Sequence, residues 1–250
     1  MESQFLLINK PKEWTSHDVV GYLRKQYPRK TKVGHAGTLD PFATGLLIVG
    51  VGRESTKRLD EFKNMPKVYI ATLKLGATST TFDPEGEITL TPNSNNQTQT
   101  ITNIEETLQS FVGKQLQIPP MFSAKKVGGQ KLYDLARKGI EIERQPNEIE
   151  IYNIELLEYN NKLSPYKGEQ TRSDRGGQTE DELPTLKIKV GCSTGTYIRT
   201  LAHDIGQKLG CGAYCEELER TSIGEYKLED AQSISNPRNE GEKSLSFVKL

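Results

Sequence analysis

The chain has 250 residues, of which 34% are hydrophobic and 26% are charged, as in ordinary globular proteins with a buried core. No apolar run approaches the roughly 18–20 residues that span a bilayer, so we expect no membrane segment. The chain has three cysteines, an odd number that does not indicate a set of disulfides. We therefore expect a reducing compartment, the cytoplasm.

Charge is distributed unevenly along the chain, although the formal net charge is zero. Residues 1–67 contain 12 Lys and Arg against 7 Asp and Glu, whereas residues 140–186 contain 5 against 11. Local potential, rather than net charge, governs the attraction of phosphate. The N-terminal segment could therefore present a basic face to a nucleic acid, although a chance fluctuation of the surface gives the same pattern.

The first half of the chain predicts two helices and a strand. Ser16 is a candidate N-cap for a helix with apolar residues at helical spacing up to Tyr27. Residues 67–75 alternate and carry β-branched side chains, which is typical of a strand. A polar loop at 91–103 overlaps a capping-box pattern at Thr102 and Glu105, which predicts the start of another helix.

The second half begins with a break at Pro119 and Pro120. Residues 131–138 predict a helix that ends at Gly139. Alternation at 149–159 and 186–190 predicts two strands.

A polar, charged segment at 160–184 separates these strands and predicts an exposed loop. Thr196 is a candidate cap for a helix that presents apolar residues up to Leu209 and ends at Gly210. The predicted strands and helices do not alternate regularly, as they would in a βαβ fold. The pattern predicts an α+β fold with a mixed, largely antiparallel central sheet flanked by helices and long loops.

One carboxylate, Asp40, lies in a loop between Gly37 and Gly45 and directly precedes Pro41. The proline biases Asp40 toward extended backbone, and the glycines allow turns and the close approach of a ligand. A common interpretation is a helix start, with Asp as the N-cap and Pro in the first turn. The other is an anchored catalytic acid.

Several familiar chemistries are excluded by spacing. No Gly-Lys-Ser/Thr follows the glycines, as a phosphate-binding P-loop requires. Asp40 has no second carboxylate nearby, as a glycosidase needs. The residues that could suggest zinc match no common spacing for that metal; they are Cys192, His203, Cys211 and Cys215. We therefore expect no metal site.

Several segments, in a fixed order, resemble the bacterial tRNA pseudouridine-55 synthase family (TruB). The resemblance covers about residues 5–232 and is most specific around Asp40. The matching segments are 9–11 (NKP), 15–18 (TSHD), 34–45 (GHAGTLDPFATG), 67–69 (KVY), 119–124 (PPMFSA), 131–133 (KLY), 195–201 (GTYIRTL) and 209–213 (LGCGA).

This resemblance implies the pseudouridine synthase fold and the isomerisation of uridine 55 in the T-loop of tRNA, without cofactor or metal. In that reaction the N1–C1′ bond breaks, the base rotates, and C5 joins C1′. Asp40 is the implied nucleophile, and the residues leave open whether it attacks the ribose or the base. The stacked target base must first flip into a pocket.

The resemblance also implies roles for further residues. Tyr69 packs against the flipped base, Tyr197 assists proton transfer at C5, and Arg199 pairs with Asp40 and keeps it ionised. His35 fills the space that the base leaves, or contacts displaced nucleotides. The implied substrate-binding positions are Lys10, His35, Lys67 and Leu218.

The resemblance implies one catalytic domain over residues 1–235 and a tail over 236–250, without the C-terminal RNA-binding (PUA) module usual in the family. Residues 119–142 resemble the thumb that closes over the T-loop. The expected partner is the T-arm of tRNA, bound by a monomer with no obligatory protein partner. The absence of the PUA module is the main expected departure from the family pattern. Two further departures are Glu13, where Gly is frequent, and Glu219, where a basic residue commonly precedes Arg220.

Two other functions compete with this one. A guide-RNA-dependent synthase of the dyskerin type is disfavoured by the ATGL form of residues 43–46. An RNA-binding tRNA folding chaperone without catalysis is opposed by the presence of all four implied catalytic residues, which are Asp40, Tyr69, Tyr197 and Arg199.

Overall fold

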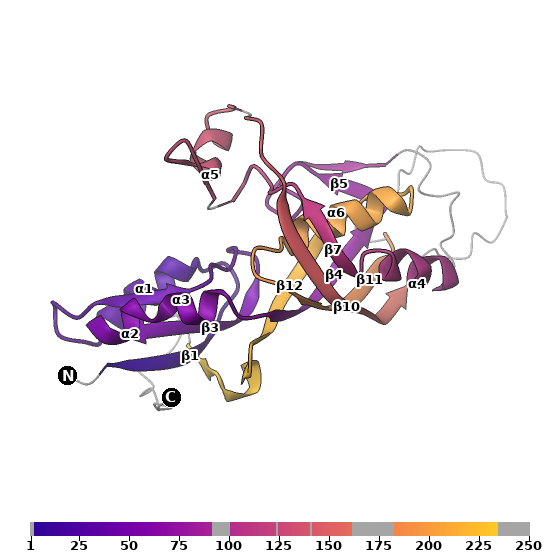
Figure 1. The fold of residues 1–250 in the computed structure, drawn as a ribbon. Coiled ribbons are helices and arrows are strands. Elements are labelled where there is room, and N and C mark those ends of the chain that lie inside the picture. The colour runs from indigo at the N-terminus through magenta and orange to yellow at the C-terminus, as the bar shows by residue number, and fades with distance from the viewer. Residues whose placement is uncertain (1–2, 92–100, 124, 141, 162–182, 235–250) are drawn as a thin grey trace, which may run out of the picture.

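The computed structural model describes residues 3–91, 101–123, 125–140, 142–161 and 183–234. Figure 1 shows an elongated molecule whose N-terminal half lies beside a larger half built on the remaining strands. The N-terminal elements are β1 (Gln4–Lys10), α1 (Ser16–Arg24), β2 (Val33–Ala36), β3 (Thr44–Val51), α2 (Arg53–Lys57) and α3 (Leu59–Lys63).

The larger half carries most of the sheet, together with helices α4, α5 and α6. Its first elements are β4 (Lys67–Leu75), β5 (Ala77–Ser79), β6 (Ile88–Leu90), α4 (Ile101–Gln109), β7 (Gly113–Gln117), β8 (Lys126–Val127), β9 (Gln130–Lys131) and α5 (Leu132–Ala136). The chain continues through β10 (Asn147–Asn160), β11 (Thr185–Cys192), α6 (Ile198–Lys208), β12 (Ala213–Ile223), β13 (Tyr226–Lys227), the 3-10 helix η3 (Leu228–Asp230) and β14 (Gln232–Ser233).

One sheet runs through both halves in the order β14-β1-β3-β12-β4-β11-β10-β7. Its pairings are antiparallel except at β1–β14 and β12–β3. The predicted α+β class with a mixed, largely antiparallel sheet is confirmed. The strands expected at 67–75, 149–159 and 186–190 are confirmed as β4, β10 and β11. In the larger half, α4 packs against β10, and α6 packs against β12 and β4.

Helix α1 begins one residue away from the expected cap. Thr15 is the N-cap: its hydroxyl accepts from the amide of Asp18, whose carboxylate accepts from the amide of Thr15. The prediction for Ser16 is wrong because its side chain is used elsewhere. The buried Ser16 hydroxyl accepts from the amide of Leu39 at 2.8 Å and lies 3.2 Å from the Leu39 carbonyl. It thereby fixes the residue before Asp40.

Two further cap predictions are wrong. Helix α4 already includes Ile101, so Thr102 lies inside it. Helix α6 has Tyr197 as its N-cap, and the Thr196 hydroxyl instead donates to the carbonyl of Ser193 at 3.0 Å. The apolar face expected for α6 is confirmed, because the residues that form it are buried; they are Ile198, Leu201, Ala202, Ile205 and Leu209.

The segment 119–142 leaves the sheet after β7 and contains β8, β9 and α5. In Figure 1, α5 stands away from the sheet, above the N-terminal half. Helix α5 is shorter than the predicted 131–138, and Gly139 follows with a positive φ of 70°. Most of the loop predicted at 160–184, like the tail at 236–250, lies outside the described residues. Among those described, no helix is both long and apolar enough to cross a membrane.

Strand β12 joins the two halves. It pairs with β4 along its length and forms a short parallel ladder with β3, in which Arg220 faces Gly45. Gly45 has φ 104°, and a Cβ at this position would lie 2.4 Å from the carbonyl oxygen of Arg220. Glycine is therefore required for the close approach that brings the Asp40 loop against β12.

Candidate active site

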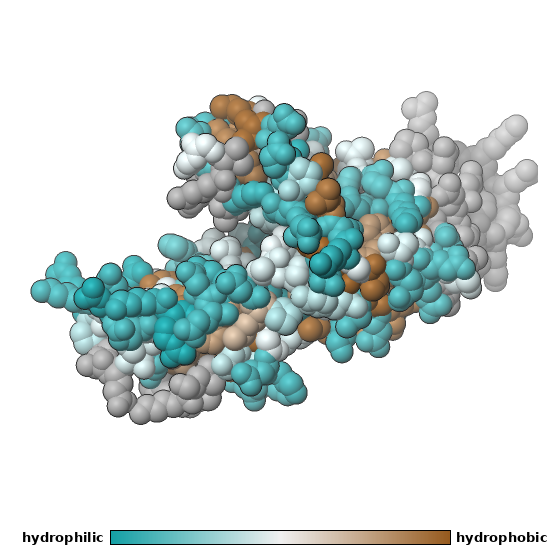
Figure 2. All heavy atoms as spheres, viewed as in Figure 1, coloured by the Kyte–Doolittle hydropathy of each residue, from teal (hydrophilic) through white to brown (hydrophobic). Residues whose placement is uncertain are grey.

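A cavity of about 540 Å³ opens where the two halves meet. Its wall comes from the loop 35–40, the ends of α3 and β4, the segment 193–199, Ser123 and β12. Figure 2 shows the surface hollowed between the α5 segment and the N-terminal half. Seven of the eight predicted site residues line this cavity; they are His35, Asp40, Lys67, Tyr69, Tyr197, Arg199 and Leu218.

The carboxylate of Asp40 forms a two-point ion pair with Arg199. Nε of Arg199 lies 2.8 Å from one oxygen, and Nη2 donates to the other at 3.1 Å. This fork geometry is the strong form of a guanidinium–carboxylate contact. No helix follows Asp40, so the helix-cap interpretation is wrong. Its carbonyl accepts from the amide of Ala43 in a turn, which leaves the carboxylate to face Arg199.

Arg199 is nearly fully buried and has further partners beyond Asp40. Its Nη1 lies 3.0 Å from the carboxylate of Asp83 and donates to the carbonyl of Thr81, while Nη2 donates to the carbonyl of Phe122. Sequence analysis missed Asp83. The only local signal was that Asp83-Pro84 repeats the Asp-Pro dipeptide of the first loop.

The surroundings of Asp40 affect the pKa of its carboxyl in opposite directions. Burial raises the pKa of the Asp40 carboxyl above its ordinary value, and the nearby negative charge of Asp83 acts in the same direction. The Arg199 guanidinium opposes both effects. The carboxylate thus depends on Arg199 for its charge.

Two tyrosines approach the cavity from different elements. Tyr69 is buried on β4 and Tyr197 stands at the start of α6. Burial raises the pKa of both phenols, so both are neutral near pH 7. The charge of Arg220 lies close enough to Tyr69 to oppose the rise in its pKa.

Arg220 itself holds the loop that precedes Asp40. It is 1% exposed, and its Nε donates to the carbonyl of Leu46 at 2.8 Å while Nη2 donates to that of Gly37 at 3.0 Å. Sequence analysis noted Arg220 only as a neighbour of Glu219. Its contacts join residues more than 170 positions apart, which no local pattern indicates.

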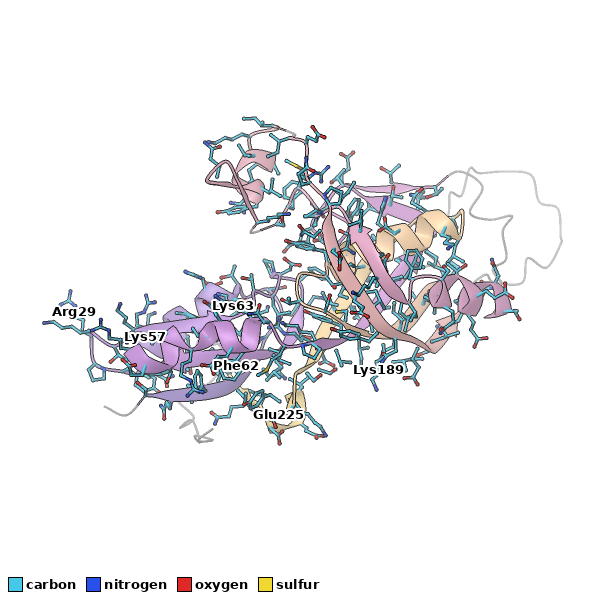
Figure 3. All side chains as sticks on the ribbon, viewed as in Figure 1. Arg29, Lys57, Phe62, Lys63, Lys189 and Glu225 are labelled. Atoms are coloured by element: carbon cyan, nitrogen blue, oxygen red, sulfur yellow. The ribbon has the colours of Figure 1, made fainter. Side chains whose placement is uncertain are left out.

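Lys63 and Lys67 also line the cavity. The ammonium of Lys67 donates to the carbonyls of Lys63 and Met65, and burial, followed by the charge of Arg220, lowers its pKa to about 8. Figure 3 shows Lys63 at the end of α3, on the side turned toward the α5 segment. His35 is half-buried, and burial lowers its pKa to about 4, so the imidazole is neutral at pH 7.

Lys10 is the predicted site residue that does not line the cavity. It is fully buried, and its ammonium donates to the carbonyls of Pro11, Trp14 and Pro41. An ammonium has three hydrogens, so these contacts use its whole donor capacity. The structure therefore places Lys10 beneath the loop of Asp40, where it supports Pro41.

The two departures from the family pattern lie close to the site. Glu13 has a positive φ of 69°, and its amide donates to the carbonyl of Pro41 at 2.8 Å. Glu219 lines a separate pocket of about 220 Å³ together with Lys12. Leu218 is buried, and its side chain lines both this pocket and the main cavity.

The cysteines are buried free thiols. Within the part of the chain that the structure describes, no three His, Cys, Asp or Glu side chains form a group that could hold a metal ion. Burial raises the pKa of Cys192 to about 11. These residues therefore resemble packing positions rather than ligands.

Family models and known proteins match most of the chain. Residues 24–198 match the model for the TruB family pseudouridylate synthase N-terminal domain, and residues 199–236 match that for the tRNA pseudouridylate synthase B C-terminal domain. A tRNA pseudouridine synthase B of Syntrophomonas wolfei is 47% identical over 92% of this chain and 70% of its own length. That of Phocaeicola vulgatus is 45% identical over 94% and 92%.

Among solved structures, the chain resembles one from a Cbf5–Nop10–Gar1 complex, with a TM-score of 0.61 and 26% identity. The match covers 92% of this chain and about half, 52%, of that one. Asp40, Tyr69 and Tyr197 lie within the range of the first family model, and Arg199 is the first residue of the second. The chain belongs to the TruB family of pseudouridylate synthases.

Proposed function

We propose that this protein converts uridine 55 in the T-loop of tRNA to pseudouridine, with Asp40 as the nucleophile. One observation carries the proposal: in a member of this family, the only carboxylate that the described residues place on the wall of a cavity of about 540 Å³ is paired with a buried guanidinium. The cavity falls within the range of about 300–1,000 Å³ that is typical of ligand sites.

The reaction changes bonds without changing composition. The N1–C1′ bond breaks and the C5–C1′ bond forms, while the hydrogen on C5 is lost and N1 gains one. No water is consumed, so a second carboxylate to activate water is unnecessary. A reaction of this kind suits a cavity lined by one carboxylate, Asp40, that is paired with the guanidinium of Arg199.

The walls of the cavity suggest how a flipped base is held. Tyr69 and Leu218 provide flat and apolar surface for the ring, and Tyr197 lies beside the Asp40–Arg199 pair with a neutral phenol that can relay the C5 proton. Flipping costs a few kcal/mol, which apolar contact inside the pocket would offset. Neutral His35 at the rim suits contact with displaced bases better than contact with phosphate.

The remaining surfaces suit a structured RNA. Lys63, whose ammonium pairs with Asp60, lies on the side of the molecule turned toward α5, next to the hollow where a phosphate backbone would lie. We assign the T-arm to this hollow, with residues 119–142 as the thumb over it and residues 1–235 as the catalytic domain. Free buried cysteines fit a reducing compartment, and we place the protein in the cytoplasm.

The likeness to a chain of the Cbf5–Nop10–Gar1 complex makes a guide-dependent reaction the second candidate. Identity of 45–47% to proteins named tRNA pseudouridine synthase B, against 26% to that chain, favours direct action on tRNA. A tRNA folding role without chemistry would need no acid paired with a buried guanidinium on the cavity wall.

The proposal is tested with unmodified tRNA that carries ³H at C5 of its uridines, in the absence of guide RNA and other proteins. We expect one tritium to be released per tRNA, and none from a tRNA with cytidine at position 55. Release that requires a guide would support the second candidate. Equal release from the cytidine-55 substrate would refute the assigned target.

A further inference from the structure

Gln117, the last residue of β7, is a polar side chain that the proposed chemistry leaves without a role. It is 4% exposed. Its side-chain amide contacts the backbone of Tyr197 twice: the Tyr197 N–H donates to Oε1 at 2.8 Å, and Nε2 donates to the Tyr197 carbonyl at 3.0 Å. These two residues lie 80 positions apart in the chain.

The conformation of Tyr197 explains why a glutamine fits. With φ −99° and ψ 106°, Tyr197 has extended backbone, so its N–H and carbonyl point to the same side, as in a strand. An amide side chain offers one acceptor and one donor in a plane and can satisfy both groups at once. Gln117 therefore bonds both backbone groups of Tyr197, the N-cap of α6, as the backbone of a neighbouring strand would.

The same stretch of chain touches the site again farther on. The carbonyl of Phe122 accepts from Nη2 of Arg199 at 2.8 Å, and Ser123 lines the cavity near Tyr197. Residues 117–123 thus lead from the end of β7 into the segment 119–142. They contact the start of α6 twice, through Gln117 and through Phe122. A shift of this connection would displace Tyr197 directly.

We infer that Gln117 is a positioning residue for Tyr197, which holds the tyrosine at the distance from the substrate that proton transfer at C5 requires. The inference rests on the proposed function. It predicts that loss of the two hydrogen bonds slows the chemical step and leaves substrate binding almost unchanged, since Gln117 does not line the cavity.

The test compares Gln117→Met and Gln117→Glu with Gln115→Met. Gln115 is a matched control on the same strand, two residues earlier, because its amide donates to the carbonyl of Phe111 and not to the site. For each variant, kcat and KM are measured on tRNA with ¹H or ²H at C5 of uridine. We expect both Gln117 variants to lose about 10- to 100-fold in kcat at pH 7.5, with KM within about twofold and a larger isotope effect.

Gln117→Glu gives a second signature. The introduced carboxylate keeps the acceptor for the Tyr197 N–H but places an oxygen against the Tyr197 carbonyl. Protonation restores a donor, so activity relative to the original protein should recover as the pH falls through the pKa of the introduced carboxyl, whereas Gln117→Met should show no recovery.

Several results would overturn the inference. They are an unchanged kcat in Gln117→Met, an equal loss in Gln115→Met, a loss with an unaltered isotope effect, or failure of both Gln117 variants to fold, which would make the contact merely structural. Absence of tritium release from the original protein would instead refute the proposed function, so the two failures are distinguishable.

Discussion

Arg199 is the residue on which the charge of Asp40 depends. Burial and Asp83 raise the pKa of the Asp40 carboxyl above its ordinary value of 3.8, and the ion pair with Arg199 acts in the opposite direction. A nucleophile must be ionised, so these opposing influences bear directly on turnover.

The first prediction concerns pH. The single-turnover rate should fall as pH is lowered through the raised pKa of Asp40, which places the acid limb above pH 3.8. Arg199→Met removes the opposing charge and should move this limb to higher pH, whereas Arg199→Lys keeps the charge, moves it less, and slows turnover because the fork is lost. Rate profiles from pH 4 to 8 measure both effects. An acid limb that Arg199→Met leaves in place would contradict the account.

The site residues that belong to distinctive motifs could be predicted from the sequence. Asp40, Tyr69, Tyr197 and Arg199 all line one cavity, as expected of a common site. The sequence did not indicate Asp83, whose importance comes from its contact with Arg199 across 116 positions. Lys10 differs from these residues: the family resemblance implied that it binds substrate, but its buried ammonium donates to three backbone carbonyls.

At the scale of elements, the start of α1 performs two separate tasks with adjacent residues. Thr15 caps the helix, whereas Ser16 bonds the backbone of Leu39 next to Asp40. One task concerns helix stability, and the other concerns the position of Asp40, the proposed nucleophile.

The second prediction separates these tasks. Ser16→Ala leaves buried polar groups of Leu39 unsatisfied and should cost about 1–3 kcal/mol in unfolding free energy, together with a fall in kcat. Thr15→Ala should cost about 1 kcal/mol and leave kcat unchanged. Urea unfolding and steady-state kinetics on the two variants provide the measurements. Equal kcat values for both would show that the Ser16 contact does not position Asp40.

The third prediction concerns the turn at Glu13. Its φ of 69° is costly for a residue with a Cβ, yet its amide must stay in place to donate to the carbonyl of Pro41. Glu13→Gly should raise the unfolding free energy by roughly 0.5–1 kcal/mol, after the greater flexibility of glycine in the unfolded chain is allowed for. Glu13→Ala should give no such gain. If both substitutions stabilised the protein equally, the carboxylate rather than the backbone would be responsible.

Elements were easier to predict than their ends. Alternation identified β4, and the apolar face of α6 was clear, because both patterns reflect burial along a single element. The three expected caps failed because Ser and Thr side chains have many possible partners. For Ser16 and Thr196 the actual partners, Leu39 and Ser193, are set by tertiary contact or by the local turn.

At the scale of the whole molecule, the site lies where β12 joins the two halves. Sequence predicted the class of the sheet but not its order, since the pairing of β12 with both β3 and β4 depends on contacts between segments far apart in the chain. That pairing places Arg220 beside Gly37 and Leu218 beside the cavity. A shift of β12 would therefore alter the walls of the site together with the sheet.

Figure 2 shows the α5 segment and the N-terminal half as the two sides of one hollow. Recognition of a folded T-arm by shape is consistent with two such sides. We expect a T-arm minihelix to bind within about tenfold of whole tRNA, or about 1.4 kcal/mol. Direct titration of both RNAs at one salt concentration tests this fourth prediction, and a much weaker minihelix would place essential contacts elsewhere on the tRNA.

The role of Asp40 in the chemistry can be measured by tritium release from tRNA labelled at C5 of uridine. Asp40→Asn preserves shape and removes the charge, while Asp230→Asn makes the same change at an exposed position of η3 far along the chain. We expect Asp40→Asn to fold and bind tRNA but to release no tritium above background, and Asp230→Asn to release it at the original rate. Tritium release by Asp40→Asn at the original rate would show that Asp40 is not the nucleophile.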